Sequence, residues 1–195
     1  MTPLSPSLQG GFGHSANAQV PKAWEPDLDA LRRRMASLAP GDHLACVYRT
    51  DEERGALVSA FVREGLDQGD KILLLADEAQ VRKDLDGGAG EAAFVAPGGH
   101  AGGLRVLPAD RSYTLKSVFD PGRMLGLLEE EVRRARSEGF RALRAAGEMD
   151  WALQGLPGTD RLVEYEARVN DLLQEGACLA LCLYDQRRFP PSVLL

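Results

Sequence analysis

The stretch Lys71–Ala76, KILLLA, has the length of a strand and is apolar at every position after its first. A strand with one face in water alternates apolar and polar residues, whereas a continuous apolar run is typical of a strand covered on both faces. His43–Tyr48 (HLACVY) and Cys178–Tyr184 (CLALCLY) have a similar apolar character. These three segments predict buried strands of a parallel sheet that lies between two layers of helices.

Helical patterns separate these strands and two further ones, which are predicted at Leu104–Ala109 and Arg141–Met149. A capping box formed by Thr50 and Glu53 predicts the start of a helix that ends near Gly69. More helices are predicted over Glu78–Leu85, from Pro121 to about Glu138, and from Thr159 or Asp160 to Gly176. Because strands alternate with helices, we expect right-handed crossovers and a layered α/β/α fold with a mostly parallel sheet.

The sequence divides into three parts. Residues 1–26 contain many Gly, Pro, Ser, Ala, Asn and Gln residues and show little apolar periodicity, which predicts a flexible leader. Residues 27–38 predict an N-terminal amphipathic helix that covers the domain's own core or contacts a partner. Its apolar side chains fall on one stripe: Leu28, Leu31, Met35 and Leu38. Residues 39–195 form the α/β domain, with a weak strand expected at Ala92–Ala96 inside a glycine-rich stretch.

Charge and composition argue against several classes of partner. The chain has 23 Lys and Arg against 29 Asp and Glu, a net charge of −6, and its arginines are interleaved with acids. Binding to nucleic acid is therefore not expected. Because no apolar run approaches the ~18 residues that span a bilayer and no secretory signal begins the chain, we expect a cytoplasmic protein without membrane attachment. Its cysteines show no CxxC spacing, so neither a disulfide nor a metal site is predicted.

The chain lacks the motifs of the common nucleotide sites, since it has neither GxxxxGK[ST] nor a GxGxxG after a strand. The helix after the first strand begins with the acids Asp51, Glu52 and Glu53, which would repel a triphosphate. His43 and Cys46 resemble a base and a nucleophile, but residues three apart in a strand point to opposite faces. We therefore expect no catalytic residue, no cofactor and no enzyme activity.

Acidic and aromatic residues cluster where three predicted strands end. Glu148, Asp150 and Trp151 lie at or just after the end of one strand, and Tyr48 and Asp185 lie at the ends of two others. Because the carboxyl ends of parallel strands meet at one edge of the sheet, these side chains are expected to lie close together. Such a cluster would suit a small polar or cationic ligand.

Residues of the last long helix and the last strand extend this hypothesis. Glu166 and Asn170 share one face of the helix, and we expect that face to point toward the acidic cluster. An alternative interpretation is structural: Trp151 and Tyr184 then pack in the core, and Arg188 pairs with a carboxylate. The residues alone leave both interpretations open.

Five blocks, taken in order, resemble the MEDS domain, a sensory module named for methanogens and methylotrophs. They are GDHLACVYRTDEER (Gly41–Arg54), FVREGLDQGDKILLLAD (Phe61–Asp77), LRAAGEMDWAL (Leu143–Leu153), LVEYEARVN (Leu162–Asn170) and CLYDQRRFPP (Cys182–Pro191). The resemblance covers roughly residues 37–194. It implies a module that senses a ligand or relays a signal, with a fold similar to the RecA-like circadian-clock ATPases but without a functional phosphate loop. The cysteine of the family falls at Ala45 here, one position before Cys46.

The resemblance and the edge cluster together give ten candidate ligand-binding residues: His43, Tyr48, Glu53, Glu148, Trp151, Glu166, Asn170, Tyr184, Asp185 and Arg188. We expect a non-catalytic sensory domain that binds a small molecule and signals to a protein such as a kinase, an anti-sigma factor or a transcription regulator. A homodimer is compatible with this role. Two alternatives stay open: a degenerate RecA-like module that binds ATP or another nucleotide, and a ligand-free interaction domain that uses the helix over Leu28–Leu38.

Overall fold

The computed structural model describes residues 27–86, 103–174 and 176–194. Within these residues, five strands form one sheet in which all neighbouring strands are parallel. Their order across the sheet is β1-β5-β4-β2-β3. The bounds are β1 His43–Tyr48, β2 Lys71–Leu75, β3 Leu104–Val106, β4 Leu143–Glu148 and β5 Cys178–Asp185.

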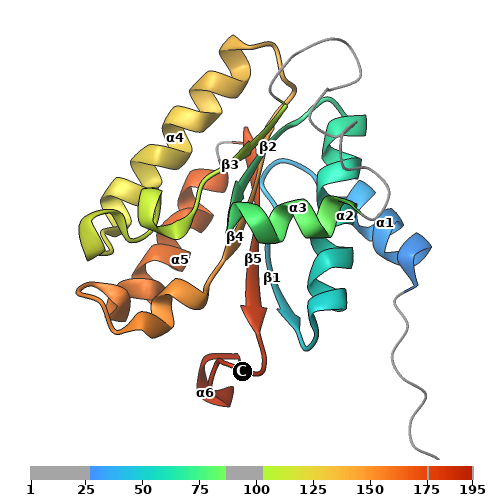
Figure 1. The fold of residues 1–195 in the computed structure, drawn as a ribbon. Coiled ribbons are helices and arrows are strands. Elements are labelled where there is room, and N and C mark those ends of the chain that lie inside the picture. The colour runs from blue at the N-terminus through green and yellow to red at the C-terminus, as the bar shows by residue number, and fades with distance from the viewer. Residues whose placement is uncertain (1–26, 87–102, 175, 195) are drawn as a thin grey trace, which may run out of the picture.

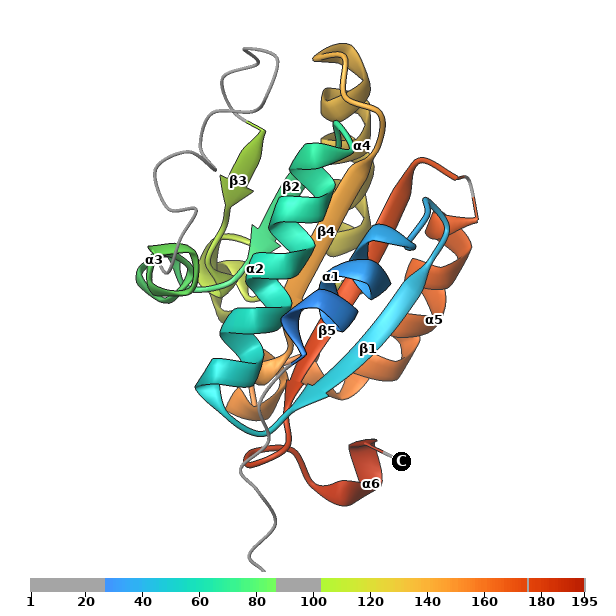
Figure 2. The ribbon, with the colours of Figure 1, turned by 90° about the vertical axis from the view of Figure 1, so that its right-hand side faces the viewer.

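Helices cover both faces of this sheet (Figure 1, Figure 2). The first three pack on one face, α4 and α5 pack on the other, and the short α6 follows β5. Their bounds are α1 Leu28–Ala36, α2 Asp51–Asp67, α3 Glu78–Asp86, α4 Pro121–Ser137, α5 Leu162–Leu173 and α6 Pro191–Leu194. The predicted fold class, a layered α/β/α arrangement around a parallel sheet, is confirmed. None of the described helices is long and apolar enough to cross a membrane.

Side-chain alternation along the strands builds one apolar core on each face of the sheet. β5 contributes to both. Leu179, Leu181 and Leu183 enter the core beneath α1, α2 and α3, and the residues between them enter the core beneath α4 and α5. Each of these leucines is at most 2% exposed, and such burial stabilises a protein by about 1.5–3 kcal/mol per side chain. This two-sided burial explains the nearly continuous apolar runs of the inner strands β2 and β5, which are buried at every position. β1 lies at the edge of the sheet and is only partly buried, so the prediction that His43–Tyr48 is a buried strand is wrong.

Two helix starts that the sequence predicted are confirmed by their capping contacts. The Thr50 side chain accepts a hydrogen bond from the Glu53 backbone N–H at 3.1 Å, which begins α2. The Asp120 side chain accepts one from the Arg123 N–H at 2.7 Å, and Pro121 occupies the first turn of α4. Each contact satisfies a backbone donor that has no partner inside the helix.

Several predicted bounds shift in the structure. The last long helix begins at Leu162, because residues 159–161 form a 3-10 turn before it. The strands predicted at 104–109 and 141–149 are both shorter. The predicted leader over 1–26 and the weak strand over 92–96 lie outside the described residues.

A buried arginine ties α1 and α2 to the amino-terminal end of β4. The Arg144 side chain is fully buried, and its Nε donates to Asp70 Oδ2 at 2.6 Å. Its remaining nitrogens donate to the Met35 carbonyl at 3.2 Å and to Gln68 Oε1 at 3.0 Å. α2 approaches closely here, since a Cβ at Gly65 would lie 2.5 Å from Arg144 Cδ. This end of the sheet is closed by satisfied polar contacts.

The carboxyl-terminal end of the sheet is arranged differently. β2 and β4 are neighbours, yet the chain continues from β2 to β3 on one side and from β4 to β5 on the other. In open α/β sheets, such a point of diverging connections leaves a crevice beyond the strand ends, and ligands bind there. The strand order therefore predicts a ligand site beyond the carboxyl ends of β2 and β4.

Candidate functional site

A cavity of about 460 Å³ lies at this switch point. Its walls come from the segments after β2, β3 and β4, together with one arginine after β5. The lining residues are Leu75, Ala76, Asp77, Pro108, Ala109, Asp110, Thr114, Glu148, Asp150, Trp151, Gln154 and Arg188. The volume is within the range of small-molecule sites, about 300–1,000 Å³. Four acids and one base line the cavity, so its charge favours a neutral or cationic ligand over an anion.

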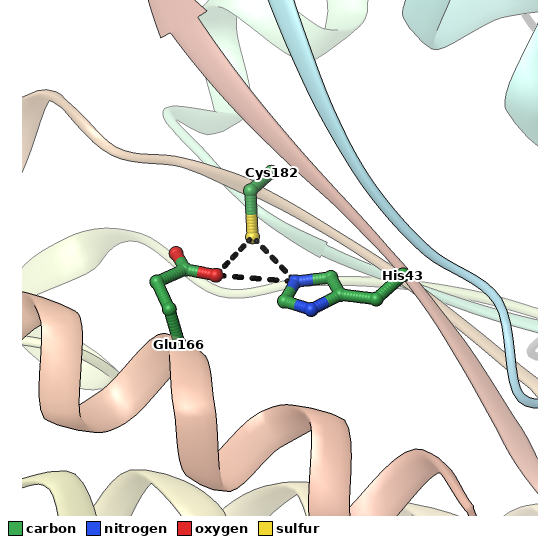
Figure 3. A group of neighbouring side chains, drawn as sticks. All are labelled: His43, Glu166 and Cys182. Carbon is green, nitrogen blue, oxygen red and sulfur yellow. Dashed lines mark hydrogen bonds and ion pairs between the residues drawn. The ribbon is translucent and has the colours of Figure 1, made fainter. Parts of the chain in front are cut away.

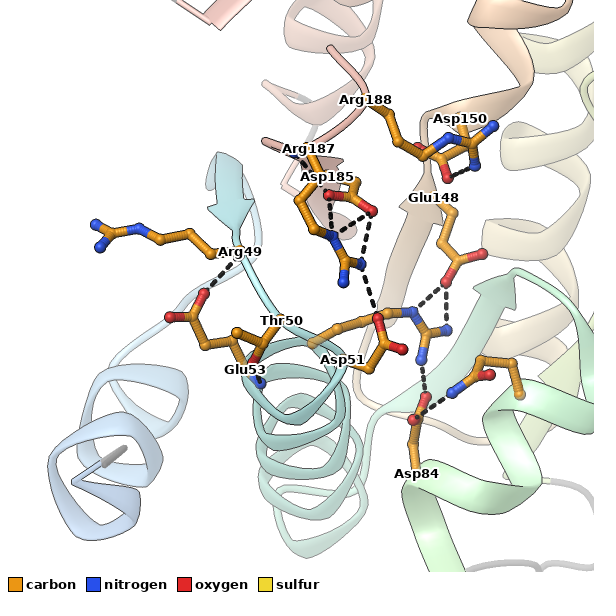
Figure 4. Close-up of polar contacts among 12 residues, drawn as sticks. Arg49, Thr50, Asp51, Glu53, Asp84, Glu148, Asp150, Asp185, Arg187 and Arg188 are labelled. Carbon is orange, nitrogen blue, oxygen red and sulfur yellow. Dashed lines mark hydrogen bonds and ion pairs between the residues drawn. The ribbon is translucent and has the colours of Figure 1, made fainter. Parts of the chain in front are cut away.

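Glu148 connects the cavity to two helices through Arg54, whose side chain lies buried on α2. The Arg54 guanidinium contacts both Glu148 and Asp84, and Asp84 belongs to α3 (Figure 4). Burial raises the pKa of Glu148 above its ordinary value, although the neighbouring Arg54 opposes the shift. The Glu148 side chain remains 21% exposed, so a bound ligand can compete for it.

Two buried polar atoms of cavity-lining residues have no hydrogen-bond partner within the described residues: Trp151 Nε1, a donor, and Asp150 Oδ1, an acceptor. The other oxygen of Asp150 pairs with Arg188 (Figure 4). Burial raises the pKa of Asp150, while Arg188 opposes the shift. Because buried polar atoms are almost always paired, an unpaired donor and acceptor beside a cavity indicate a position for a ligand.

Trp151 also belongs to an aromatic cluster beneath the cavity. Its ring stacks on Tyr113 with 4.7 Å between centroids and contacts Phe119 at 4.2 Å. Tyr165 meets Phe119 edge to face at 5.6 Å. Trp151 is 2% exposed, so it is a wall of the cavity and a core residue at once. The structural alternative raised from the sequence therefore describes Trp151 in part.

Tyr48 and Asp185 end the two neighbouring strands, β1 and β5, and are both buried. Burial raises the pKa of Tyr48 strongly, and the nearby Asp150, Glu148 and Asp185 add to the shift. Asp185 accepts hydrogen bonds from Arg187 at 2.9 Å, and Arg187 also reaches Asp51 at 2.7 Å (Figure 4). Tyr48 and Asp185 are thus near the acidic group but are not among the described residues that line the cavity.

Glu53 has a capping role in the structure. Its Oε2 accepts the Arg49 backbone N–H at 2.6 Å, while its own N–H donates to the Thr50 side chain. The carboxylate therefore occupies the amino-terminal end of α2, where a phosphate loop would present free N–H groups. Glu53 does not line the switch-point cavity; it lines a separate pocket between α1, α2 and β1.

The other four candidates meet on the face covered by α5. His43 Nδ1 lies 2.8 Å from Asn170 Oδ1, and its Nε2 lies 3.2 Å from Glu166 Oε2. The Tyr184 hydroxyl donates to Glu166 Oε1 at 2.9 Å. Burial alone would lower the pKa of His43, but the hydrogen bonds to Glu166 and Asn170 outweigh it and raise the pKa. Glu166 and Asn170 therefore face His43, not the acidic cluster as the helix pattern suggested.

A cysteine that sequence reasoning passed over completes this second group. Cys182 Sγ lies 3.4 Å from His43 Nε2 and 3.7 Å from Glu166 Oε2 (Figure 3). Cys46 packs on the opposite face, against the core beneath α1 and α2, which agrees with the prediction that His43 and Cys46 point apart. The described cysteines are all free thiols. The pairing of β1 with β5 is what brings Cys182 to this group. Cys182 pairs with Ala45, which lies two residues beyond His43 and therefore on the same face of β1.

Comparisons with known proteins agree with this architecture. The model of the family described as MEDS, "MEthanogen/methylotroph, DcmR Sensory domain", matches residues 42–195. The transcriptional repressor DcmR of Methylorubrum extorquens (strain DSM 6343 / CIP 106787 / DM4) is 31% identical over 165 residues, which cover 81% of this chain and 57% of that relative. The chain thus spans a little over half the length of the relative that it matches. Because the family model covers most of the chain, this protein belongs to the MEDS family of sensory domains.

Proposed function

We propose that this chain is a non-catalytic sensory module that binds a small polar or cationic molecule in the switch-point cavity and signals its presence to a transcription regulator. The observation that carries the proposal is the cavity itself, which combines unpaired buried polar atoms of Asp150 and Trp151 with an acidic lining. Membership of a sensory family supports the general role, and the name of the repressor relative supports the kind of partner.

A route from the cavity to the surface runs through Arg54. In the free protein, Arg54 joins Glu148 at the cavity to Asp84 on α3, and Gln80 adds a hydrogen bond to Asp84 at 3.2 Å. A cationic ligand competes with Arg54 for Glu148. The loss of that contact weakens the connection of α2 to the sheet edge and changes how α3 is held. In this proposal a partner recognises the altered position of α3, so the ligand acts by differential contact with two states.

Thermal unfolding against two panels tests the proposal, one panel of small organic amines and alcohols and one of Mg-nucleotides. A ligand at 100 times its dissociation constant stabilises the folded chain by about 2.7 kcal/mol, which raises the midpoint of a domain this size by roughly 5–10 °C. We expect a shift with compounds of the first panel. A shift with nucleotides alone would support the nucleotide-binding alternative, and no shift in either panel would support the ligand-free interaction domain.

Paired variants locate the site. Asp150→Asn removes a carboxylate from the cavity lining and preserves its shape, so the ligand-induced shift should fall by at least half. Asp160→Asn removes an exposed acid of the 3-10 turn before α5, away from the cavity, and serves as the control. An equal response of the two variants would place the ligand elsewhere.

A further inference from the structure

Three side chains from separate elements bring a nitrogen, an oxygen and a sulfur together beneath α5 (Figure 3). His43 comes from β1, Cys182 from β5 and Glu166 from α5. Their ligand atoms all lie within 4.8 Å of one another. The three are far apart in the sequence, so only the fold assembles them. The sequence spacing of the cysteines gave no indication of this group.

The triangle formed by the three atoms has the size that a tetrahedral metal ion requires. Zinc lies about 2.0–2.1 Å from a histidine nitrogen, about 2.0–2.2 Å from a carboxylate oxygen and about 2.3 Å from a thiolate sulfur. At tetrahedral angles these bonds place the ligand atoms roughly 3.3–3.6 Å apart. The observed separations are 3.2 Å for nitrogen and oxygen, 3.4 Å for nitrogen and sulfur, and 3.7 Å for sulfur and oxygen.

Neighbouring groups hold two of the three ligands in a binding orientation. Asn170 Oδ1 lies 2.8 Å from His43 Nδ1, so the N–H at that nitrogen donates to it and neutral histidine has its lone pair on Nε2, which faces Cys182 and Glu166. The Tyr184 hydroxyl donates to Glu166 Oε1 at 2.9 Å and leaves Oε2 directed at His43. Such outer contacts fix the tautomer and the ring orientation at metal sites.

From this geometry we infer that His43, Glu166 and Cys182 form a binding site for a divalent transition-metal ion of the zinc class. The imidazole and thiolate donors exclude magnesium and calcium, which prefer oxygen. Three protein ligands leave the fourth position for a water or a small molecule. The Glu166 side chain is 24% exposed and that of His43 13%, so an ion reaches the group from solvent on the α5 side.

In this structure the three side chains contact one another directly, through His43 and Cys182, Cys182 and Glu166, and His43 and Glu166. A metal ion binds a deprotonated thiolate, so its binding at this site would release the thiol proton to solvent. The site does not depend on the ligand cavity, which lies at the carboxyl edge and shares none of these three residues.

Cobalt binding tests the inference, because a Co²⁺–thiolate bond gives a charge-transfer absorption that histidine and carboxylate ligands do not. We expect the chelator-treated chain to develop this band to saturation at one Co²⁺ per chain, and Zn²⁺ to displace it. Zn²⁺ at 100 times its dissociation constant should raise the unfolding midpoint by roughly 5–10 °C. Absence of the band at saturating Co²⁺ would overturn the inference.

Four variants assign the ligands. Cys182→Ser should abolish the band, and Cys178→Ser should retain it, because Cys178 is also buried, on the same strand and in the same core. His43→Gln should weaken binding more than tenfold, and Asn170→Ala, which frees the ring, should weaken it roughly 10–100-fold. Circular dichroism in chelator establishes that each variant is folded. An unchanged titration in both Cys182→Ser and His43→Gln would sink the proposal.

Discussion

A buried arginine lies at each end of β4, Arg144 on the strand itself and Arg54 on α2, and Arg54 contacts a residue that lines the switch-point cavity. At the amino end, Arg144 pairs with Asp70, and both side chains are fully buried. At the carboxyl end, Arg54 pairs with Asp84 and Glu148, and Glu148 also lines the switch-point cavity. The same chemistry is therefore sealed at one end of the sheet and accessible at the other.

The connections of the chain explain the difference. At the amino end, α2 approaches the sheet closely over Gly65 and its C-terminal turn supplies Gln68 as a further partner for Arg144. At the carboxyl end, the chain leaves β2 and β4 toward opposite sides of the sheet, and the space between the ends of these two strands stays open. A buried ion pair is weak evidence for stability by itself, because the desolvation of both charges offsets their attraction. The solvent accessibility of each ion pair indicates whether a ligand can contact it.

The largest loss of stability is expected at the amino end of β4, where the ion pair is sealed. Arg144→Met leaves Asp70 buried and paired, among the described residues, with the half-exposed Arg141 alone, so the free energy of unfolding should fall by about 3–5 kcal/mol. Urea unfolding followed by circular dichroism measures the change. If the variant folds, its ligand-induced shift should equal that of the unmodified chain. A loss below about 1 kcal/mol would show that Arg144 is dispensable for the closed end.

A smaller loss of stability is expected at the carboxyl end of β4, beside the cavity. Arg54→Met removes the partner of both Glu148 and Asp84, but Glu148 is partly exposed and its raised pKa allows it to take up a proton. The free energy of unfolding should fall by about 2–3 kcal/mol, less than for a sealed pair. In contrast to Arg144→Met, this variant should show the same hydrogen-exchange protection of α3 with and without ligand. Hydrogen exchange of α3 with and without ligand measures that difference.

The sequence predicted the framework of both ends but not their contacts. Apolar runs such as Lys71–Ala76 and the capping box at Thr50 located strands and helices, because burial on both faces and an unpaired helix terminus each restrict the residue type locally. No local restriction on residue type gives the order of the strands in the sheet. The adjacency of β2 and β4, which creates the cavity, depends on how the whole chain packs.

The candidate site was predicted in part for the same reason. Glu148, Trp151 and Arg188 line the cavity; Glu148 ends β4, and the other two follow strand ends in the sequence. Arg54 was missed, because it lies within a helix whose pattern gives no sign of its partners. Glu166 and His43 were assigned to one site with Glu148, whereas they meet Cys182 on the other face. Sequence periodicity gives the face of an element, and only the register identifies what that face meets.

The pH dependence of stability distinguishes the effect of burial on Glu148 from the effect of Arg54. The folded pKa of Glu148 is raised by burial, above the value of about 4.3 for an unfolded chain. Its contribution to stability is therefore fully present below the unfolded pKa and is lost as pH rises through the folded pKa. Consequently, the unfolding free energy of the unmodified chain minus that of Glu148→Gln should decrease as pH rises above the unfolded pKa of about 4.3. An increase would mean that Arg54 outweighs burial, so that Glu148 behaves as a sealed ion pair.

The smallest effect on stability is expected at Asp110, which separates ligand binding from folding most cleanly. Asp110 is exposed, lines the cavity and makes no hydrogen bond or ion pair recorded within the described residues. Asp110→Asn should therefore change the free energy of unfolding by no more than about 0.5 kcal/mol. If the ligand is cationic, the loss of one lining charge should weaken its binding severalfold at low salt and less at high salt. Titration calorimetry at two salt concentrations, with Asp160→Asn as the matched control, measures both quantities. Equal, salt-independent affinity of the two variants would mean that the acids at the open end shape the cavity without attracting its ligand.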